Sequence, residues 1–282
     1  MNKWIIGARI KTLPAAISPV LVGTALATQI NWLNATLALT VSLSLQIAVN
    51  YANDFSDGIR GTDNNRVGPI RLVGSGLATA KAVKNAAFIS LAIAAIAGLF
   101  LAIQTSYWLI AVGAISILAA WGYTGGKKPY GYLGFGELSV FIFFGLVATV
   151  GSYYVQTGEI SGQSVFLSFA IGSLACAILV INNLRDLPLD AKVGKKTLAV
   201  RLGDSKTRYL YVWLLIIAQV ISAYAYTFNS YALLTLIWLP LTVRNARLVL
   251  QGSTGQALIP LLVNTARLQL FLSFTLGLAL FL

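Results

Sequence analysis

Histidine is missing from this 282-residue sequence, and Cys176 is its one cysteine. These absences exclude serine-histidine-aspartate catalysis, zinc sites built from histidine or cysteine, iron-sulfur clusters, covalent haem attachment and disulfides within the chain. Any bound metal must therefore be held by oxygen ligands. Cys176 itself lies inside an apolar stretch, where a small packing role is the simplest interpretation.

Charge is also scarce, and the apolar residues form long runs. Only 10% of the residues are charged, 57% are hydrophobic, and the mean hydropathy is +0.79, which is typical of an integral membrane protein. A spanning helix needs about 20 mostly apolar residues. The sequence thus predicts an all-α polytopic membrane protein, with nine transmembrane helices around a central cavity that opens to the cytoplasmic side. The predicted spans are residues 13–30, 33–52, 82–103, 107–124, 135–155, 164–183, 208–227, 229–243 and 262–282.

The basic residues gather on one side of these spans. Lysine and arginine precede the first span, follow the second, fourth and sixth, and lie between the eighth and ninth, whereas the other turns contain none. By the positive-inside rule, we expect the N-terminus in the cytoplasm and the C-terminus outside. The net charge of +12 is then mainly a topology signal, and we expect no nucleic-acid partner.

Five of the eight acidic residues fall in two short runs at the ends of predicted spans: Asp54, Asp57 and Asp63 in the first run, Asp186 and Asp190 in the second. One charged residue at the centre of a membrane helix costs about 3 kcal/mol on insertion scales, so such clustering indicates function. Solvated helix ends are the alternative interpretation, which the shared spacing and sidedness of the two runs disfavour.

Both runs have helical spacing. Residues separated by three, four or seven positions share one face of a helix. That spacing relates Asn50, Asn53, Asp54 and Asp57 in the first run, and Asn182, Asn183, Asp186 and Asp190 in the second. Oxygen ligands in a shielded, hydrated place favour Mg2+, which commonly bridges carboxylates to a substrate phosphate.

A phosphorylated substrate would need a basic shell, because the carboxylates and a diphosphate together exceed the charge of two Mg2+ ions. The available cations are Arg60, Arg66, Arg71, Lys127, Lys128, Arg185, Lys192, Lys195 and Lys196. Tyr123, in a glycine-rich cytoplasmic turn, is a further candidate to face the cavity. Glu137, at the start of the fifth span, either caps that helix, pairs with Lys127 or contacts substrate.

The recurrence of the Asn/Asp motif four spans later, in the same orientation, indicates a coarse internal repeat. We expect a single domain over residues 1–282, made of parallel halves at approximately 1–130 and 131–255 plus a last helix. The two motifs would then face each other across one cavity.

The residues resemble a known group, the intramembrane aromatic prenyltransferases. Members carry an Asn-Asp-x-x-Asp motif and an Asp-x-x-x-Asp motif, matching Asn53-Asp54-x-x-Asp57 and Asp186-x-x-x-Asp190. Residues 9–23, 53–76, 123–137 and 182–203 look like the branch that prenylates 1,4-dihydroxy-2-naphthoate in menaquinone synthesis. A third aspartate of the wider group is replaced here by Gly61, with Asp63 two positions later. Whether Asp63 is a direct metal ligand is left open.

This resemblance implies Mg2+-dependent transfer of a prenyl group from a polyprenyl diphosphate to the naphthoate ring, with loss of CO2, in a bacterial plasma membrane. The resemblance implies catalytic and metal-binding roles for Asp54, Asp57, Asp186 and Asp190, with Asp63 as a further metal ligand. The resemblance also implies that substrate is bound by Asn50, Asn53, Arg60, Arg66, Arg71, Tyr123, Lys127, Lys128, Asn182, Asn183 and Lys195. Arg71 or Lys195 is expected to pair with the carboxylate of the aromatic acceptor.

Two alternatives remain open. The same fold could serve another acceptor, such as 4-hydroxybenzoate, a chlorophyll or haem precursor, or a glycerol phosphate lipid. An ion-coupled transporter would also use intramembrane acids and amides, but it predicts them near the middle of the membrane and not at one edge.

Overall fold

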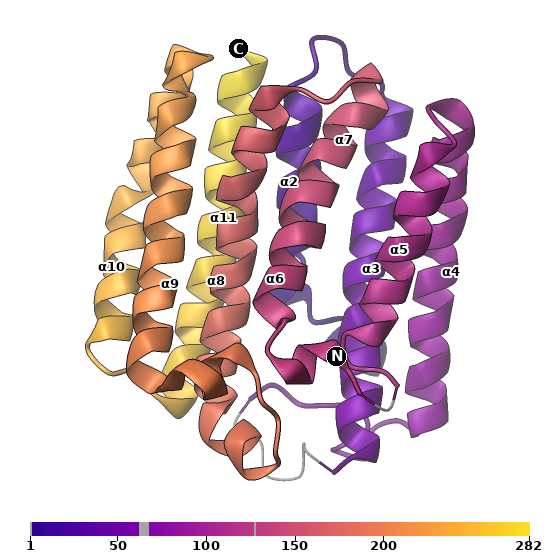
Figure 1. Cartoon of the computed structure of the whole chain (residues 1–282), viewed down its shortest axis with the longest axis vertical. Coiled ribbons are helices and arrows are strands. Elements are labelled where there is room, and N and C mark those ends of the chain that lie inside the picture. Colours follow the sequence, from indigo (N-terminus) through magenta and orange to yellow (C-terminus); the bar gives the residue numbers. More distant parts are fainter. Residues whose placement is uncertain (1, 62–67, 127) are drawn as a thin grey trace.

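The computed structural model describes residues 2–61, 68–126 and 128–282. Nearly parallel helices make up the molecule, with the C-terminus at the upper end in Figure 1 and the N-terminus near the lower end. The principal helices are α1 (Lys3–Ala8), α2 (Pro14–Ala25), α3 (Trp32–Ile59), α4 (Ala80–Gln104), α5 (Trp108–Gly122), α6 (Gly136–Val140), α7 (Ala148–Thr157), α8 (Gly162–Lys192), α9 (Leu198–Tyr224), α10 (Leu239–Leu250) and α11 (Leu258–Phe281).

Two longer helical segments contain stretches that are not α-helical. A π-helical stretch, η3 (Phe141–Val147), joins α6 to α7, and a 3-10 stretch, η5 (Ser230–Trp238), leads into α10. Shorter 3-10 turns are η1 (Ile10–Thr12), η2 (Tyr130–Leu133), η4 (Ala225–Thr227) and η6 (Gly255–Ala257).

The all-helical, multi-pass character predicted from composition is confirmed, whereas the count of nine spans is not. Within the described ranges, seven helical stretches are long and apolar enough to cross a membrane, and an eighth is obtained if Lys3–Thr12 and Pro14–Ala25 form one span bent by 53°. The predicted span at 107–124 corresponds to α5, whose 15 residues fall short of the roughly 20 that a perpendicular span needs.

The bend near the N-terminus has a local cause. Arg9 ends α1 in the left-handed conformation, which breaks the helical path. Pro14 then starts α2 at a position where its missing N–H costs nothing, since the first turn of a helix has no partner for that donor.

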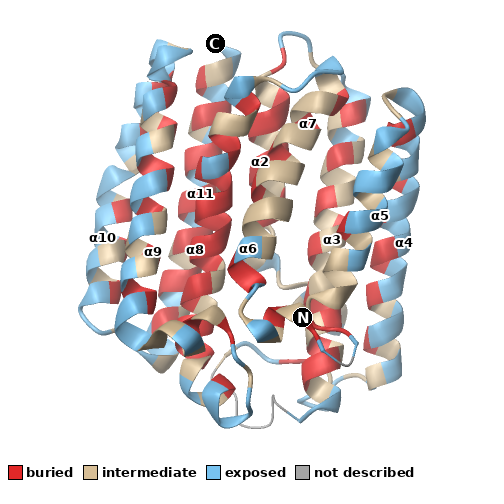
Figure 2. Ribbon diagram, in the orientation of Figure 1, coloured by how far each residue is buried: buried red, intermediate tan, exposed pale blue. Residues whose placement is uncertain are grey.

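Helix α8 is the central element of the bundle. Of its apolar window, 78% is buried, against 22–44% for the other spans, and it contacts α9, α11, α2 and the α6–α7 segment. Figure 2 shows buried residues concentrated along α8 and α11, while α4, α5 and α10 carry many exposed positions. The exposed large apolar side chains on these outer helices are those expected to face lipid.

Glycines allow the α6–α7 segment to approach α8 closely. A Cβ atom built on Gly145 would lie 2.7 Å from the Cα of Gly172 and 3.1 Å from the carbonyl oxygen of Ser168. Backbone atoms cannot turn aside as a side chain can, so the two helices meet only because both residues lack a side chain. This contact places the α6–α7 segment, which carries Glu137, against α8.

We therefore expect Gly145→Ala to destabilise the protein by about 1–3 kcal/mol through overpacking. Gly162→Ala is the matched control, because Gly162 is also helical but has open space around its Cβ position. Melting temperatures in detergent compare the two variants. Equal melting temperatures would show that the helices do not depend on this contact.

Candidate active site

The two acidic runs meet in one polar pocket at the lower end of the bundle. Helix α3 contributes Asn53 and Asp57, which are four residues apart, and α8 contributes Asn182, Asp186 and Asp190 at the same spacing. The pocket has a volume of about 80 Å³. Its other lining residues are Arg9, Arg71, Tyr123, Thr124, Gly131, Tyr132, Leu179, Asn183, Leu189, Lys195 and Thr197.

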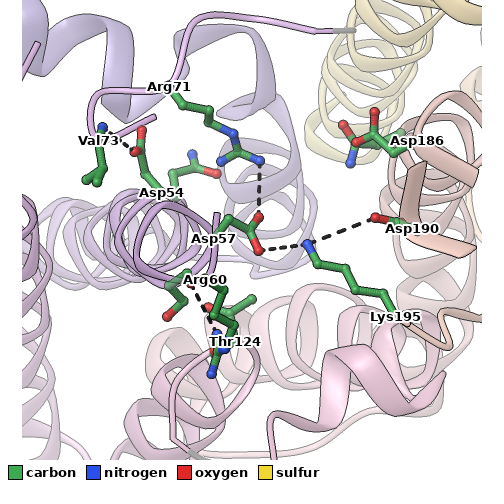
Figure 3. A network of polar contacts seen from close by, with 12 residues as sticks. Asp54, Asp57, Arg60, Arg71, Val73, Thr124, Asp186, Asp190 and Lys195 are labelled. Atoms are coloured by element: carbon green, nitrogen blue, oxygen red, sulfur yellow. Dashed lines mark hydrogen bonds and ion pairs between the residues drawn. The ribbon is translucent and has the colours of Figure 1, made fainter. Parts of the chain in front are cut away.

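Asp57 is the centre of a network of polar contacts (Figure 3). The Lys195 ammonium lies 2.7 Å from one carboxylate oxygen, and the Arg71 guanidinium lies 3.7 Å from the other. The hydroxyl of Tyr132 donates a short hydrogen bond to the same carboxylate. Burial, followed by the negative charge of Asp57, raises the pKa of Tyr132, so this hydroxyl stays protonated and available as a donor.

The acids of α8 are also paired. Arg185 donates two hydrogen bonds to Asp186, at 2.8 and 2.7 Å, and a third to the side-chain oxygen of Asn182 at 2.8 Å. Lys195 lies 4.0 Å from Asp190, so this one cation stands between the acids of α3 and α8. Each acid of the pocket is thus held near a cation of the chain itself, which offsets the cost of burying it.

Asp54 has a different position from the other acids. It is fully buried, does not line the pocket, and accepts hydrogen bonds from the backbone N–H groups of Leu72 (2.8 Å) and Val73 (3.0 Å). Figure 3 shows its carboxylate pointing toward Val73, away from the space between Asp57 and Asp190. Both carboxylate oxygens thus hold the backbone segment that follows Arg71, and the role of Asp54 as a direct metal ligand stays a prediction.

A second, larger cavity adjoins the polar pocket. It has a volume of about 530 Å³ and lies among α2, α3, α4, α5, the α6–α7 segment and α8. Most of its lining is apolar, including Leu45, Phe143, Phe144, Val147 and Ile178. A cavity of this size and polarity suits an apolar ligand.

The two spaces share part of their walls. Arg9, Asn53, Tyr123, Leu179 and Asn182 line both. A ligand with a charged head and an apolar body could therefore occupy both spaces at once, with its head among the acids and cations and its body among the helices.

Most predicted site residues converge on these spaces. Asn53, Asp57, Arg71, Tyr123, Asn182, Asn183, Asp186, Asp190 and Lys195 line the polar pocket, and Asn50 lines the larger cavity. Arg60 lines neither and instead donates to the carbonyl oxygens of Thr124 and Gly126, while Lys128 is exposed. Predicted residues Asp63, Arg66 and Lys127 lie outside the described residues.

Several residues of the site were not singled out from the sequence. Arg9 contributes to the positive-inside signal and begins the resembling stretch 9–23, but no role at a site was predicted for it. Tyr132 carried no signal beyond its glycine-rich surroundings. Glu137, by contrast, was singled out as a helix cap, a partner of Lys127 or a substrate contact. It lines neither space, but its carboxylate accepts a hydrogen bond of 2.9 Å from Asn183, so it orients a residue of the pocket.

The donor set of the pocket fits a hard cation such as Mg2+. Within the described ranges, no three acids lie close enough to hold a metal ion by themselves. Mg2+ does not require such a cluster, because it usually keeps several waters and is bound through one or two carboxylates plus substrate phosphates. Asn53 adds a side-chain oxygen that is buried and has no hydrogen-bond partner in the described part of the chain.

Comparison with known proteins assigns the family. The model of the UbiA prenyltransferase family matches residues 16–279. The chain belongs to the UbiA prenyltransferase family. It is 52% identical to the 1,4-dihydroxy-2-naphthoate octaprenyltransferase of Mycobacterium tuberculosis, over 93% of this chain and 91% of that protein. The enzyme of the same name from Escherichia coli K12 is 38% identical, over 94% and 90% of the two chains.

Solved structures of UbiA homologues share the fold. One from Aeropyrum pernix K1 superimposes with a TM-score of 0.74, at 17% identity over 96% of this chain and 97% of that one. Another, from Archaeoglobus fulgidus and bound to DMAPP and Mg2+, gives a TM-score of 0.71 at 14% identity over 99% of both chains. The helical arrangement described above is thus the UbiA fold.

The positions of Asp54 and Asp57 predict different effects of the same substitution. Asp54→Asn is expected to lower the melting temperature, because a buried backbone N–H loses its acceptor at about 1–3 kcal/mol, while Mn2+ binding stays within about threefold. Asp57→Asn should weaken Mn2+ binding at least about tenfold, as expected for a charged ligand. Electron paramagnetic resonance titration with Mn2+ and inorganic diphosphate measures the Mn2+ affinity of each variant, and thermal denaturation measures its melting temperature. Loss of Mn2+ binding in Asp54→Asn at unchanged stability would return Asp54 to the ligand set.

Proposed function

We propose that this chain is a Mg2+-dependent 1,4-dihydroxy-2-naphthoate polyprenyltransferase of menaquinone biosynthesis. It would transfer a prenyl group from polyprenyl diphosphate to the naphthoate ring, with loss of CO2, to give demethylmenaquinol. The observation that carries this proposal is the joining of a charged pocket to an apolar cavity through shared walls. Similarity over nearly the whole chain to naphthoate octaprenyltransferases supports the choice of acceptor.

The polar pocket suits the diphosphate head of the donor. The residues that would hold Mg2+ are Asp57, Asp186, Asp190, Asn53 and Asn182. When bound, Mg2+ supplies Lewis acidity toward the leaving diphosphate. Asp54 would act indirectly, by holding the backbone of residues 72 and 73 and so keeping Arg71 beside the pocket.

Arg71 and Lys195 are the cations best placed for the leaving group. Both now contact Asp57, and both line the pocket. A dianionic or trianionic diphosphate is a stronger partner than one carboxylate, so these side chains would turn toward it as the donor binds. Arg60, Arg66, Lys127 and Lys128 would add longer-range positive potential.

The larger cavity suits the reacting carbons. The C–O bond of the allylic donor breaks and its electron pair leaves with diphosphate, so the allylic carbon becomes cationic. The ring carbon that bears the carboxylate forms the new C–C bond, and the electron pair of the bond to the carboxylate returns to the ring as CO2 departs. An apolar lining excludes water, which would otherwise quench the cation.

Membrane placement follows the same proposal. The polar pocket lies at the end of the bundle that carries the basic connections, which supports placing it on the cytoplasmic side of a bacterial plasma membrane, with the C-terminus outside. Counting the bent N-terminal pair and α5 as spans would give the nine predicted crossings. The matching polar ends of α3 and α8 support one domain built from two halves.

The direct test is turnover by purified protein in detergent or liposomes. With a polyprenyl diphosphate, Mg2+ and 1,4-dihydroxy-2-naphthoate, we expect prenylated naphthoquinol by mass spectrometry and none after EDTA treatment. Equal product from 4-hydroxybenzoate would contradict the naphthoate assignment. Absence of any Mg2+-dependent product would contradict the proposed reaction.

Substitution of the α8 acids tests the role of the pocket. Asp186→Asn is expected to lower kcat/KM about 10²–10³-fold, because it removes charge from a preorganised electrostatic site. Glu159→Gln is the control, since Glu159 is exposed and lines neither space, and its kcat/KM should stay within about twofold. Full activity of Asp186→Asn would remove Asp186 from the catalytic set.

A further inference from the structure

Arg9 has a backbone conformation that arginine rarely adopts. Its φ of 52° and ψ of 64° are left-handed, and it is the only non-glycine residue with positive φ in the described part of the chain. Such a conformation persists only where surrounding contacts impose it, and it is found preferentially at functional sites. The presence of arginine at position 9, where glycine would adopt this conformation more easily, therefore indicates that the side chain has a role.

Neighbouring polar groups hold the break and the side chain in place. The Arg9 guanidinium donates to the backbone oxygen of Asn50 at 3.2 Å. The Asn50 amide in turn donates to the carbonyl oxygen of Ala8 (2.9 Å) and to the Thr12 hydroxyl (3.2 Å), and it accepts from Gln46 (3.3 Å). Asn50 of α3 thus accepts a bond from the guanidinium through its backbone oxygen and binds both sides of the break through its side chain.

Arg9 also occupies a distinctive place between the two spaces. It lines both the polar pocket and the apolar cavity, and it is the only charged residue among the described residues that line the cavity. Its polar neighbours there, including Thr12, Gln46 and Asn50, are uncharged. A cation at the edge of an otherwise uncharged cavity attracts an apolar ligand that carries one negative group.

The diphosphate head already has cations of its own. Arg71 and Lys195 line the pocket and contact Asp57, and Arg185 contacts Asp186 from outside the lining. An aromatic carboxylate has a flat apolar ring and a planar anion, and a guanidinium can bind such an anion through two parallel hydrogen bonds.

We propose that Arg9 binds the carboxylate of the aromatic acceptor and so sets which ring carbon faces the donor. This inference rests on the proposed function and deepens it. The ring would lie in the apolar cavity with its carboxylate-bearing edge turned to the junction, where the allylic carbon of a donor seated in the pocket would emerge. Arg9 thus replaces Arg71 and Lys195, the residues expected from the sequence to hold this carboxylate.

The test compares two unreactive probes, 1-hydroxy-2-naphthoate and 1-naphthol, which differ by the carboxylate. Arg9→Gln should raise the Kd of 1-hydroxy-2-naphthoate roughly 10- to 100-fold, the loss of a charge-assisted hydrogen bond, and leave that of 1-naphthol within about twofold. Arg9→Gly should behave alike and fold readily, because glycine favours the left-handed conformation. Arg244→Gln is the matched control, since Arg244 is exposed and lines neither space.

Titration calorimetry in detergent gives the two affinities, and steady-state kinetics give KM for each substrate. The inference expects a higher KM for the naphthoate and an unchanged KM for the polyprenyl diphosphate. Equal weakening of both probes, or a raised KM for the donor alone, would overturn it. If wild-type protein prenylates a different aromatic carboxylate with the same dependence on Arg9, the naphthoate assignment fails and the role of Arg9 stands.

Discussion

Neutralisation of buried carboxylates is the constraint on which the site depends. Asp57, Asp186 and Asp190 lie inside an apolar bundle, where an unpaired charge would be costly. Arg71, Arg185 and Lys195 neutralise them within the chain. Arginine and lysine also bind diphosphate well. When a metal and a phosphorylated substrate arrive, the carboxylates would bind the metal and the cations would bind the phosphate, so that no charge is left unpaired. Under the proposed function, stability of the free protein and recognition of the donor would use one set of residues.

The charged pocket and the apolar cavity lie next to each other along the bundle, which is the arrangement that the proposed chemistry needs. The charged pocket is small and lies at one end, whereas the apolar cavity extends among the helices and shares its wall. A reactive carbon released at the junction would pass directly from a polar surrounding to one that excludes water. Asp54 and Arg9 hold two segments beside this junction, the chain that presents Arg71 and the break in the first span. In both cases a charged side chain bonds to backbone groups of a distant segment, and the type of side chain alone does not reveal such a contact.

Much of the architecture follows from local sequence. Long apolar runs predict the spanning helices, and the spacing of Asn53 and Asp57, or of Asn182, Asp186 and Asp190, places each set on one helical face. The acids and amides of the polar pocket were predicted in this way, whereas Arg71, Tyr123 and Lys195 were predicted from charge, a glycine-rich turn and family resemblance. Local spacing could not separate Asp54 from its neighbours, because adjacent residues differ by about 100° around a helix and either edge of a wide polar stripe could face the pocket. The length of α5 and the bend between α1 and α2 also depend on packing and turn geometry.

The sequence by itself determined that this is an all-helical membrane protein with oxygen-rich acidic motifs on two helices, since composition and periodicity are local properties. Only the tertiary structure decided which of those acids face one another, and that Asp54 binds the backbone of a distant segment. It also decided that Arg9 lies at the junction of the pocket and the cavity. The reason is physical: Arg9 meets Asn50, and Asp54 meets Leu72 and Val73, only after distant or loop segments pack together, and helical spacing carries no information about such contacts.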